Sequence, residues 1–153
     1  MDWLIALLTN PFLITSVSSW LVAQLIKVII SSIINKKFSL SWLFSDGGMP
    51  SGHSATVSSL AMFSLLSCGP SSFQFAVTMI LAIIVCHDAT GVRQEAGKHA
   101  VLLNEILESF DLLRKKMDPE MKLKEYVGHT HIQVIAGITV GIVNALVMYF
   151  FVF

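Results

Sequence analysis

Long apolar segments with very little charge constrain this chain more than any other feature. Residues 11–34 form a run of 24 residues in which Gln24 and Lys27 are the only long polar side chains, and residues 130–153 form a second run of 24. At about 1.5 Å per helical residue, each run can cross a hydrocarbon core of roughly 30 Å. Charged residues make up only 13% of the 153 residues, whereas soluble domains carry roughly 25%. We therefore predict an integral membrane protein.

Two shorter apolar segments lie between these runs. Residues 54–68 are rich in Ser and Thr, and residues 71–87 are almost entirely apolar. The predicted fold class is all-α, an integral membrane helical bundle in one domain over residues 1–153, with about four spanning helices. Residues 1–10 lack the positive charge of a cleaved signal peptide, so we expect them to be retained as an interfacial helix or a frayed start. Cys68 and Cys86 lie at the ends of apolar segments, and we expect both to be reduced packing residues.

The middle region, residues 88–128, has a different character. It carries seven of the ten Lys and Arg residues, balanced by acids. Between residues 95 and 116, apolar side chains recur at spacings of three, four and one, which is typical of an amphipathic helix. Pro119 disfavours helix in the residue before it. We predict an amphipathic helix over 95–116 that lies on the cytoplasmic side.

The placement of positive charge predicts the topology. Every Lys and Arg lies at Lys27, at Lys36 and Lys37, or between residues 93 and 124. If all four apolar segments cross, these regions share one side, which the positive-inside rule makes cytoplasmic. If residues 54–68 do not cross, the basic regions fall on opposite faces. The charge pattern favours a multi-pass protein with four crossings, in which the short second helix is tilted or shielded by its neighbours.

Two histidine turns open apolar segments at the predicted cytoplasmic end. Pro50-Ser51-Gly52-His53 precedes residues 54–68, and Gly128-His129-Thr130 precedes the last segment. A helix start offers free N–H groups to an anion, and an imidazole can attack phosphorus or protonate a leaving group. The pair indicates phosphoryl transfer, although each histidine alone could simply cap a helix. Seven cations are candidates to neutralise a phosphate: Lys27, Lys36, Lys37, Arg93, Lys98, Lys122 and Lys124.

Other polar residues near the boundary allow two interpretations. Asp88 and Arg93 are five apart and do not share a helix face. They are either structural anchors, or Arg93 binds phosphate while Asp88 orients a lysine or histidine. His129 and His131 are two apart and face different ways, so we expect no metal site and no cofactor. The basic residues are balanced by acids, which argues against nucleic acid. Clusters such as Lys36-Lys37 are typical contacts for anionic phospholipids.

Three blocks of sequence resemble one known family in order. They are residues 47–55 (GGMPSGHSA), 88–98 (DATGVRQEAGK) and 128–137, which contains Gly128-His129-Thr130 and Ala136-Gly137. Together they resemble a divergent branch of the type-2 phosphatidic acid phosphatase superfamily, which includes the vanadium-dependent haloperoxidases.

The resemblance implies a role for each matching residue. His129 matches the histidine that attacks phosphorus and forms a phosphohistidine, and His53 matches the histidine that protonates the leaving alcohol. Ser51 and the Gly52 backbone match donors to the phosphate oxygens. Lys27 is similar to the lysine that opens the family's first signature.

The chain also departs from the superfamily pattern at three places. The Arg-Pro pair of the first signature is absent from residues 34–37, and Leu123 stands where the third signature has an arginine. Gln133 stands where it has an aspartate. An amide oxygen can orient His129, but it cannot stabilise an imidazolium as a carboxylate does. We therefore expect Gln133 to activate His129 more weakly than the aspartate would.

These observations predict a metal-independent phosphatase of membrane lipid phosphates at the cytoplasmic face, acting on phosphatidylglycerol phosphate or a polyprenyl phosphate. The alternative is a non-catalytic membrane protein that binds phospholipid headgroups or a partner. A haloperoxidase is disfavoured because the dense cationic cage for vanadate is missing. Four spanning helices make a thin bundle, for which a homodimer is a natural arrangement.

Overall fold

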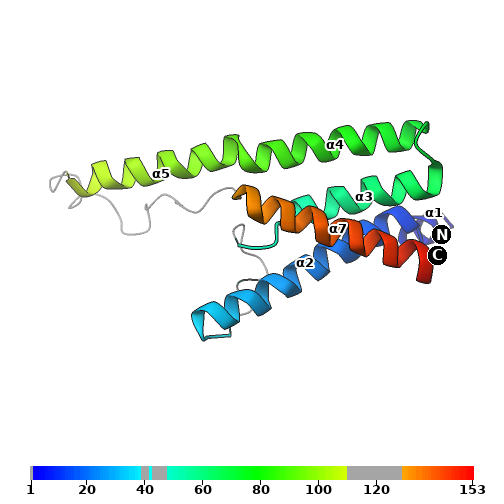
Figure 1. The fold of residues 1–153 in the computed structure, drawn as a ribbon, viewed down its shortest axis with the longest axis horizontal. Coiled ribbons are helices and arrows are strands. Elements are labelled where there is room, and N and C mark those ends of the chain that lie inside the picture. The colour runs from blue at the N-terminus through cyan, green and yellow to red at the C-terminus, as the bar shows by residue number, and fades with distance from the viewer. Residues whose placement is uncertain (1, 39–41, 43–47, 110–128) are drawn as a thin grey trace.

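The computed structural model describes residues 2–38, 42, 48–109 and 129–153, and within them it is helical with no strand. Four helices lie side by side as a bundle (Figure 1): α2, α3, α4 and α7. A short helix α1 precedes them, and α5 follows α4. The bounds are α1 Asp2–Leu8, α2 Pro11–Asn35, α3 Gly52–Cys68, α4 Phe73–Thr90, α5 Val92–Ser109 and α7 His131–Phe151. The predicted all-α membrane bundle is confirmed.

Three helical stretches within the described ranges are long and apolar enough to cross a membrane. They are α2 (Pro11–Asn35), the stretch Phe73–Ile106, which joins α4 to most of α5, and α7 (His131–Phe151). Their outward faces carry large exposed apolar side chains, such as Leu25 and Ile29 on α2 and Ile80 and Ile84 on α4. Such faces are stable against lipid and not against water. Cys68 and Cys86 are both free thiols.

Helix α3 is the exception, because it has only 17 residues and is rich in small and hydroxyl side chains. It lies against α2, α4 and α7, and this position shields it from lipid as the sequence predicted. The bundle can therefore accept a helix that is too polar to face a bilayer. Its buried residues are Gly52, Ser54, Ala55, Ser58, Ser59, Ala61, Phe63 and Ser64.

Helices α3 and α7 run in the same direction and touch through their backbones. A Cβ atom at Gly137 would overlap the carbonyl oxygen of Ser51, and one at Gly141 would overlap that of Ala55. The two glycines are four residues apart, so they lie on one face of α7. This is the small-xxx-small pattern that lets helices approach closely in membranes.

Hydrogen bonds between helices pair several of the polar side chains of the core. The Ser19 hydroxyl donates to the Ala55 carbonyl over 3.0 Å, and the Ser59 hydroxyl donates to the Thr15 carbonyl over 3.2 Å. Asn144 Nδ2 of α7 also donates to the Thr15 carbonyl, over 3.1 Å. Such bonds average about 0.6 kcal/mol each within membranes, and they also set the register of α2 against α3 and α7.

The helix directions bring the chain's chemistry to one end of the bundle. Helices α2 and α4 run toward that end, whereas α3 and α7 start from it (Figure 1). The C-terminal ends of α2 and α4 therefore lie at the same end of the bundle, as the four-segment arrangement predicted. The N- and C-termini lie at the opposite end, where Phe63 contacts Phe12, Tyr149 and Phe153 in edge-to-face geometry.

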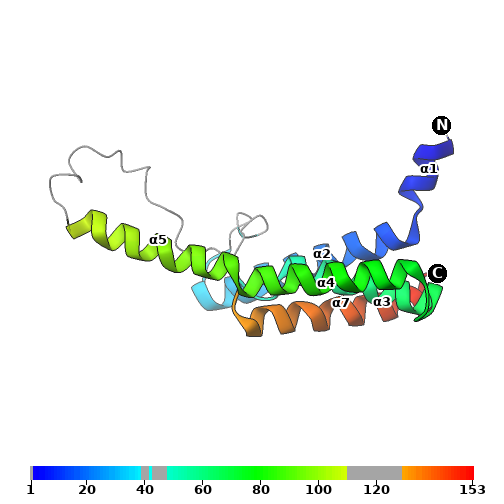
Figure 2. The same ribbon diagram turned by 90° about the horizontal axis from the view of Figure 1, so that it is seen from above.

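Two helices extend away from the bundle. Helix α1 turns aside at the terminal end (Figure 2), and each of its residues is exposed. Helix α5 continues beyond the other end almost in line with α4, after a break at Gly91. It confirms the predicted amphipathic helix over residues 95–109, where Leu102, Leu103 and Ile106 are exposed; residues 110–116 of that prediction lie outside the described residues.

We expect Gly141→Ala to destabilise the bundle by about 1–3 kcal/mol, because the added methyl group must displace the α3 backbone. Thermal unfolding in detergent, followed by circular dichroism, measures the change. Val143→Ala is the matched control, since Val143 lies on the exposed face of the same helix and its loss is expected within about 0.5 kcal/mol. Equal stability of the two variants would contradict the close α3–α7 contact.

Candidate functional site

Backbone hydrogen bonds tie three helix ends together at this end of the bundle. The Ser51 N–H, just before α3, donates to the Gln133 carbonyl in the first turn of α7 over 3.0 Å. The His129 N–H donates to the Ala89 carbonyl in the last turn of α4 over 2.9 Å. These contacts bring the rings of His53 and His129 to a centroid separation of 6.4 Å. The two histidine turns that the sequence singled out therefore form one site.

His129 is buried, with 4% of its surface exposed, and Gln133 orients its ring. His129 Nδ1 lies 3.2 Å from Gln133 Oε1, and the Thr130 N–H donates to the same oxygen over 3.0 Å. A backbone N–H can only donate, so the atom between them must be the amide oxygen. His129 Nδ1 must then carry a hydrogen, which leaves the lone pair of neutral imidazole on Nε2.

Gln133 holds this position because it also caps the helix. Thr130 is the N-cap of α7, and its hydroxyl accepts the Gln133 N–H over 3.4 Å while the Gln133 side chain accepts the Thr130 N–H. This reciprocal pair is a capping box, which favours Glu or Gln at the third helical position. The residue that departs from the superfamily pattern is thus fixed by local helix chemistry.

His53 differs from its partner because its side chain is exposed. It lies in the first turn of α3, and its ring is inclined by 56° to that of His129. A phosphorus atom within about 3–3.5 Å of one imidazole nitrogen can place its ester oxygen about 2.6–3.2 Å from the other. The observed ring separation suits this arrangement.

Ser51 serves as the N-cap of α3. Its hydroxyl oxygen accepts the Ser54 N–H over 3.3 Å and the Ser54 hydroxyl over 3.0 Å, and the residue is fully buried. The structure thus gives this side chain a structural partner. Its predicted contact with phosphate stays a prediction, as does that of the Gly52 backbone at the start of the same helix.

Helix α2 supplies a polar wall beneath the Ser51 turn. Lys27 is only 2% exposed, and its aliphatic stem packs under Gly48, whose φ of 99° favours glycine. One turn earlier, Gln24 is 6% exposed and its Oε1 has no hydrogen-bond partner. A Cβ atom at Gly52 would lie 3.6 Å from Gln24 Nε2. Sequence analysis missed Gln24 as a site residue, although its spacing of three from Lys27 places both on one helix face.

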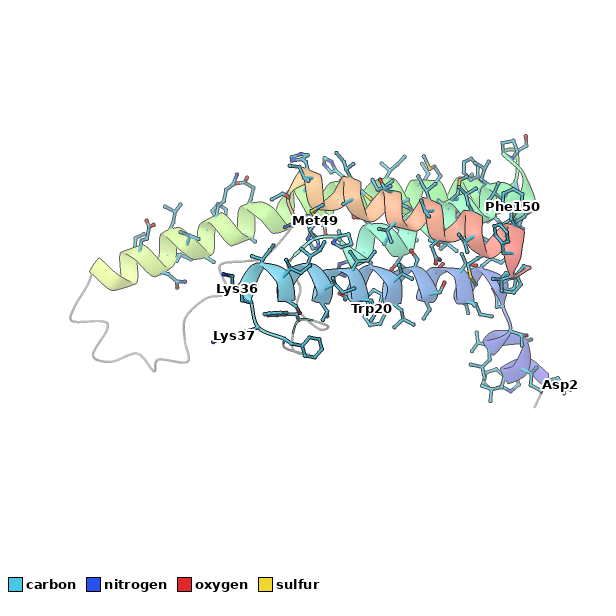
Figure 3. All side chains as sticks on the ribbon, turned by 60° about the horizontal axis from the view of Figure 1, so that its bottom comes forward. Asp2, Trp20, Lys36, Lys37, Met49 and Phe150 are labelled. Atoms are coloured by element: carbon cyan, nitrogen blue, oxygen red, sulfur yellow. The ribbon has the colours of Figure 1, made fainter. Side chains whose placement is uncertain are left out.

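The remaining predicted residues lie at varying distances from the histidines. Asp88 is half-buried next to Ala89, at the same end as His129. Lys36 and Lys37 are exposed just after the C-terminal residue of α2 (Figure 3). Lys98 pairs with Glu95 over 2.7 Å on the exposed surface of α5, which carries it away from the bundle. The structure thus does not bring Lys36, Lys37 or Lys98 to the histidine pair.

Three of the predicted cations fall on parts that the structure does not describe. Arg93 lies in α5, but its side chain is outside the described part of the chain. Lys122 and Lys124 also lie outside the described residues, as does Leu123, which stands where the superfamily has an arginine. The predicted contributions of the three cations to phosphate binding stay predictions.

Comparison with known protein families finds a match over most of this chain. The sequence profile of a family described as the divergent PAP2 family matches residues 8–144. The chain belongs to the divergent PAP2 family. The match includes both histidine turns and all four bundle helices up to Asn144 of α7, so it confirms the resemblance seen in the sequence motifs.

A relative of this divergent PAP2 protein is the "Uncharacterized membrane protein YuiD" of Bacillus subtilis (strain 168). The two chains are 40% identical over 154 residues, which cover 95% of this chain and 98% of the relative. No solved structure matches the chain. The family and the relative support a PAP2-like membrane protein.

We expect His129 to be observed as the Nδ1–H tautomer, because Gln133 Oε1 accepts from Nδ1. Nitrogen chemical shifts of ¹⁵N-histidine-labelled protein distinguish the tautomers. Gln133→Leu removes the acceptor, so the shifts of His129 should move toward the mixture of a free imidazole. Gln74→Leu is the matched control on the exposed surface of α4, and it should leave them unchanged. A wild-type Nε2–H tautomer would contradict the geometry.

Proposed function

We propose that this divergent PAP2 protein is a metal-independent phosphatase of membrane lipid phosphates that works through a phosphohistidine. The observation that carries the proposal is the pairing of His53 and His129 at 6.4 Å, with Gln133 turning His129 toward attack. His129 is buried and its Nδ1 hydrogen is directed to Gln133, whereas His53 is exposed. This asymmetry suits a nucleophile and an acid.

In the first step, the lone pair of His129 Nε2 attacks the phosphorus atom. A bond forms between nitrogen and phosphorus while the bond from phosphorus to the ester oxygen breaks. Protonated His53 gives its proton to that oxygen, and the lipid alcohol leaves. Gln133 Oε1 keeps the Nδ1 hydrogen in place, so the imidazole attacks from a fixed orientation.

In the second step, water replaces the histidine on phosphorus. His53, now neutral, accepts a proton from the attacking water. The nitrogen–phosphorus bond breaks, the electron pair returns to His129 Nε2, and inorganic phosphate leaves. Lys27 and the start of α3 are the described groups best placed to offset negative charge, because they lie at the Gly48–Gly52 turn. Arg93 is proposed to bind the phosphate with them, and Asp88 to orient a lysine or histidine.

The substrate class follows from the membrane setting of the site. A phosphate held at the bundle end beside apolar helix faces belongs to a lipid whose tail stays in the bilayer. Phosphatidylglycerol phosphate and polyprenyl phosphates both have this form. Exposed Lys36 and Lys37 at the end of α2 suit contacts with anionic headgroups of the surrounding membrane.

The same end is proposed to face the cytoplasm. All ten Lys and Arg residues lie at Lys27, Lys36, Lys37 or within residues 93–124, and the described members of this set lie toward the histidine end. This asymmetry satisfies the positive-inside rule. A homodimer is proposed as the arrangement of the thin bundle in the membrane.

A second candidate function is a non-catalytic headgroup-binding protein. The amide of Gln133, where the superfamily has a carboxylate, favours it, because an amide does not stabilise an imidazolium. This candidate predicts that phospholipid binding survives His129→Ala and that no phosphate is released.

We expect His129→Ala to abolish phosphate release from lipid phosphates in detergent, because it removes the nucleophile. His53→Ala should lower kcat by about 10²–10⁴-fold, the usual contribution of a general acid. Turnover of a phosphomonoester with a nitrophenol leaving group should fall much less in His53→Ala, since that leaving group needs no proton.

His87→Ala is the matched control at an exposed position of α4. Unchanged turnover in both site variants would exclude the mechanism, and no turnover by the wild type would favour the headgroup-binding protein.

We expect Lys37 and Ser71 to lie on opposite sides of the membrane. Single cysteines at these positions, in a Cys68→Ser and Cys86→Ser background, can be labelled with an impermeant maleimide in intact cells. The cysteine at 71 should react from outside, and the cysteine at 37 only after the cells are opened. The reverse pattern would place the histidine pair on the outer face.

A further inference from the structure

An apolar cavity that is open on one side lies between α3, α4 and α7. Its volume is about 310 Å³, which is at the lower end of the size of ligand pockets, roughly 300–1,000 Å³. Ser58 carries the only hydroxyl group among the lining residues, and the rest are apolar or sulfur-containing. The lining residues are Ser58, Ala61, Met62, Leu65, Phe75, Met79, Ala82, Ile83, Cys86, Ile138 and Ile142.

Water is a poor occupant for this cavity. A buried water needs two to four polar partners, and the walls offer a single hydroxyl. The apolar lining of the cavity therefore suits an apolar occupant.

The cavity is open toward the lipid side of α4. Met79 and Ile83 line it, and yet they are 43% and 53% exposed. Ala82, between them in the chain, is only 8% exposed and forms part of the inner wall. The occupant can therefore enter sideways from the bilayer, where acyl chains are the surrounding solvent.

The cavity also begins directly beneath the histidine site. Cys86 lies one helical turn from Ala89, whose carbonyl binds the His129 N–H. Ser58 lies one turn from Ser54, which donates to the cap residue Ser51. From Cys86 to Phe75 the lining follows α4 over eleven residues, or about 16 Å at 1.5 Å per residue. The polar site and the apolar cavity thus lie in line along the bundle axis.

We propose that this cavity binds an acyl or prenyl chain of the lipid whose phosphate lies between His53 and His129. The inference rests on the proposed phosphatase function, and it adds to that function a tail-binding site between α3, α4 and α7. Binding a tail there holds the phosphate at the end of the bundle, because the chain cannot shift sideways without leaving the cavity. Recognition is then shared between a polar end and an apolar end of one substrate.

The small residues of the inner wall make the cavity testable. Ala82→Phe places an aromatic ring into the cavity, whereas Ala76→Phe makes the same change on an exposed position of α4. The first readout is phospholipid retained by the purified protein, measured by native mass spectrometry in detergent. The second is KM for a long-chain lipid phosphate and for a water-soluble phosphomonoester without a tail.

We expect Ala82→Phe to lose retained lipid and to raise KM for the long-chain substrate by about tenfold or more, with the tail-free substrate unchanged. Ala76→Phe should match the wild type in both readouts. Equal behaviour of the two variants would overturn the tail site. Loss of a dimer without loss of retained lipid in Ala82→Phe would also overturn it, since a second copy would then be the occupant.

The two native cysteines provide a test that needs no bulky substitution. Cys86 lines the cavity, whereas Cys68 is exposed at the end of α3. A long-chain lipid phosphate should slow the reaction of Cys86 with an apolar maleimide by about tenfold and leave that of Cys68 unchanged. Equal protection of both thiols, or of neither, would overturn the proposal. Protection of Cys86 without phosphate release by the wild type would retain the tail site and reject the phosphatase.

Discussion

The close approach of the α3 and α7 backbones is the contact on which the rest of this structure depends. Gly137 and Gly141 leave no side chain between the helices, so the carbonyl groups of Ser51 and Ala55 lie where Cβ atoms would otherwise be. Only at this separation can the Ser51 N–H reach the Gln133 carbonyl. The starts of two helices are thereby held at one level, and each start carries a histidine. A larger residue at either glycine would move the site as well as the packing.

The same few residues serve both helix capping and the candidate chemistry. Gln133 completes the capping box of α7 and accepts a hydrogen bond from His129. An amide suits this half-buried position, because it fixes the tautomer without placing a charge beside buried His129, where an unpaired charge is costly. A carboxylate would activate the imidazole more strongly. The pair formed by buried His129 and exposed His53 is therefore organised more by orientation than by charge.

Sequence reasoning succeeded where a residue's role depends on neighbours in the chain. The apolar runs and the amphipathic spacing predicted the helices, and the distribution of lysines predicted which segments share an end. The Ser51 and Thr130 turns also follow local capping rules. Sequence reasoning did not select Gln24 as a site residue, and it grouped Lys98 with the phosphate-binding cations. The position of Gln24 depends on how α2 packs under Gly52, and that of Lys98 on the near-straight continuation of α4 into α5.

By itself, the sequence determined that this chain is a helical membrane protein of the PAP2 type, with two histidine turns and basic segments that share one end. These properties follow from hydrophobicity, charge and motif order, which do not depend on distant contacts. Only the tertiary structure decided that the histidine rings lie 6.4 Å apart, that His129 presents Nε2, and that a cavity of about 310 Å³ lies beneath them. Each of these three properties depends on the distance between neighbouring helices. That distance is set by which small residues face each other, and a single sequence shows the small residues without showing their partners.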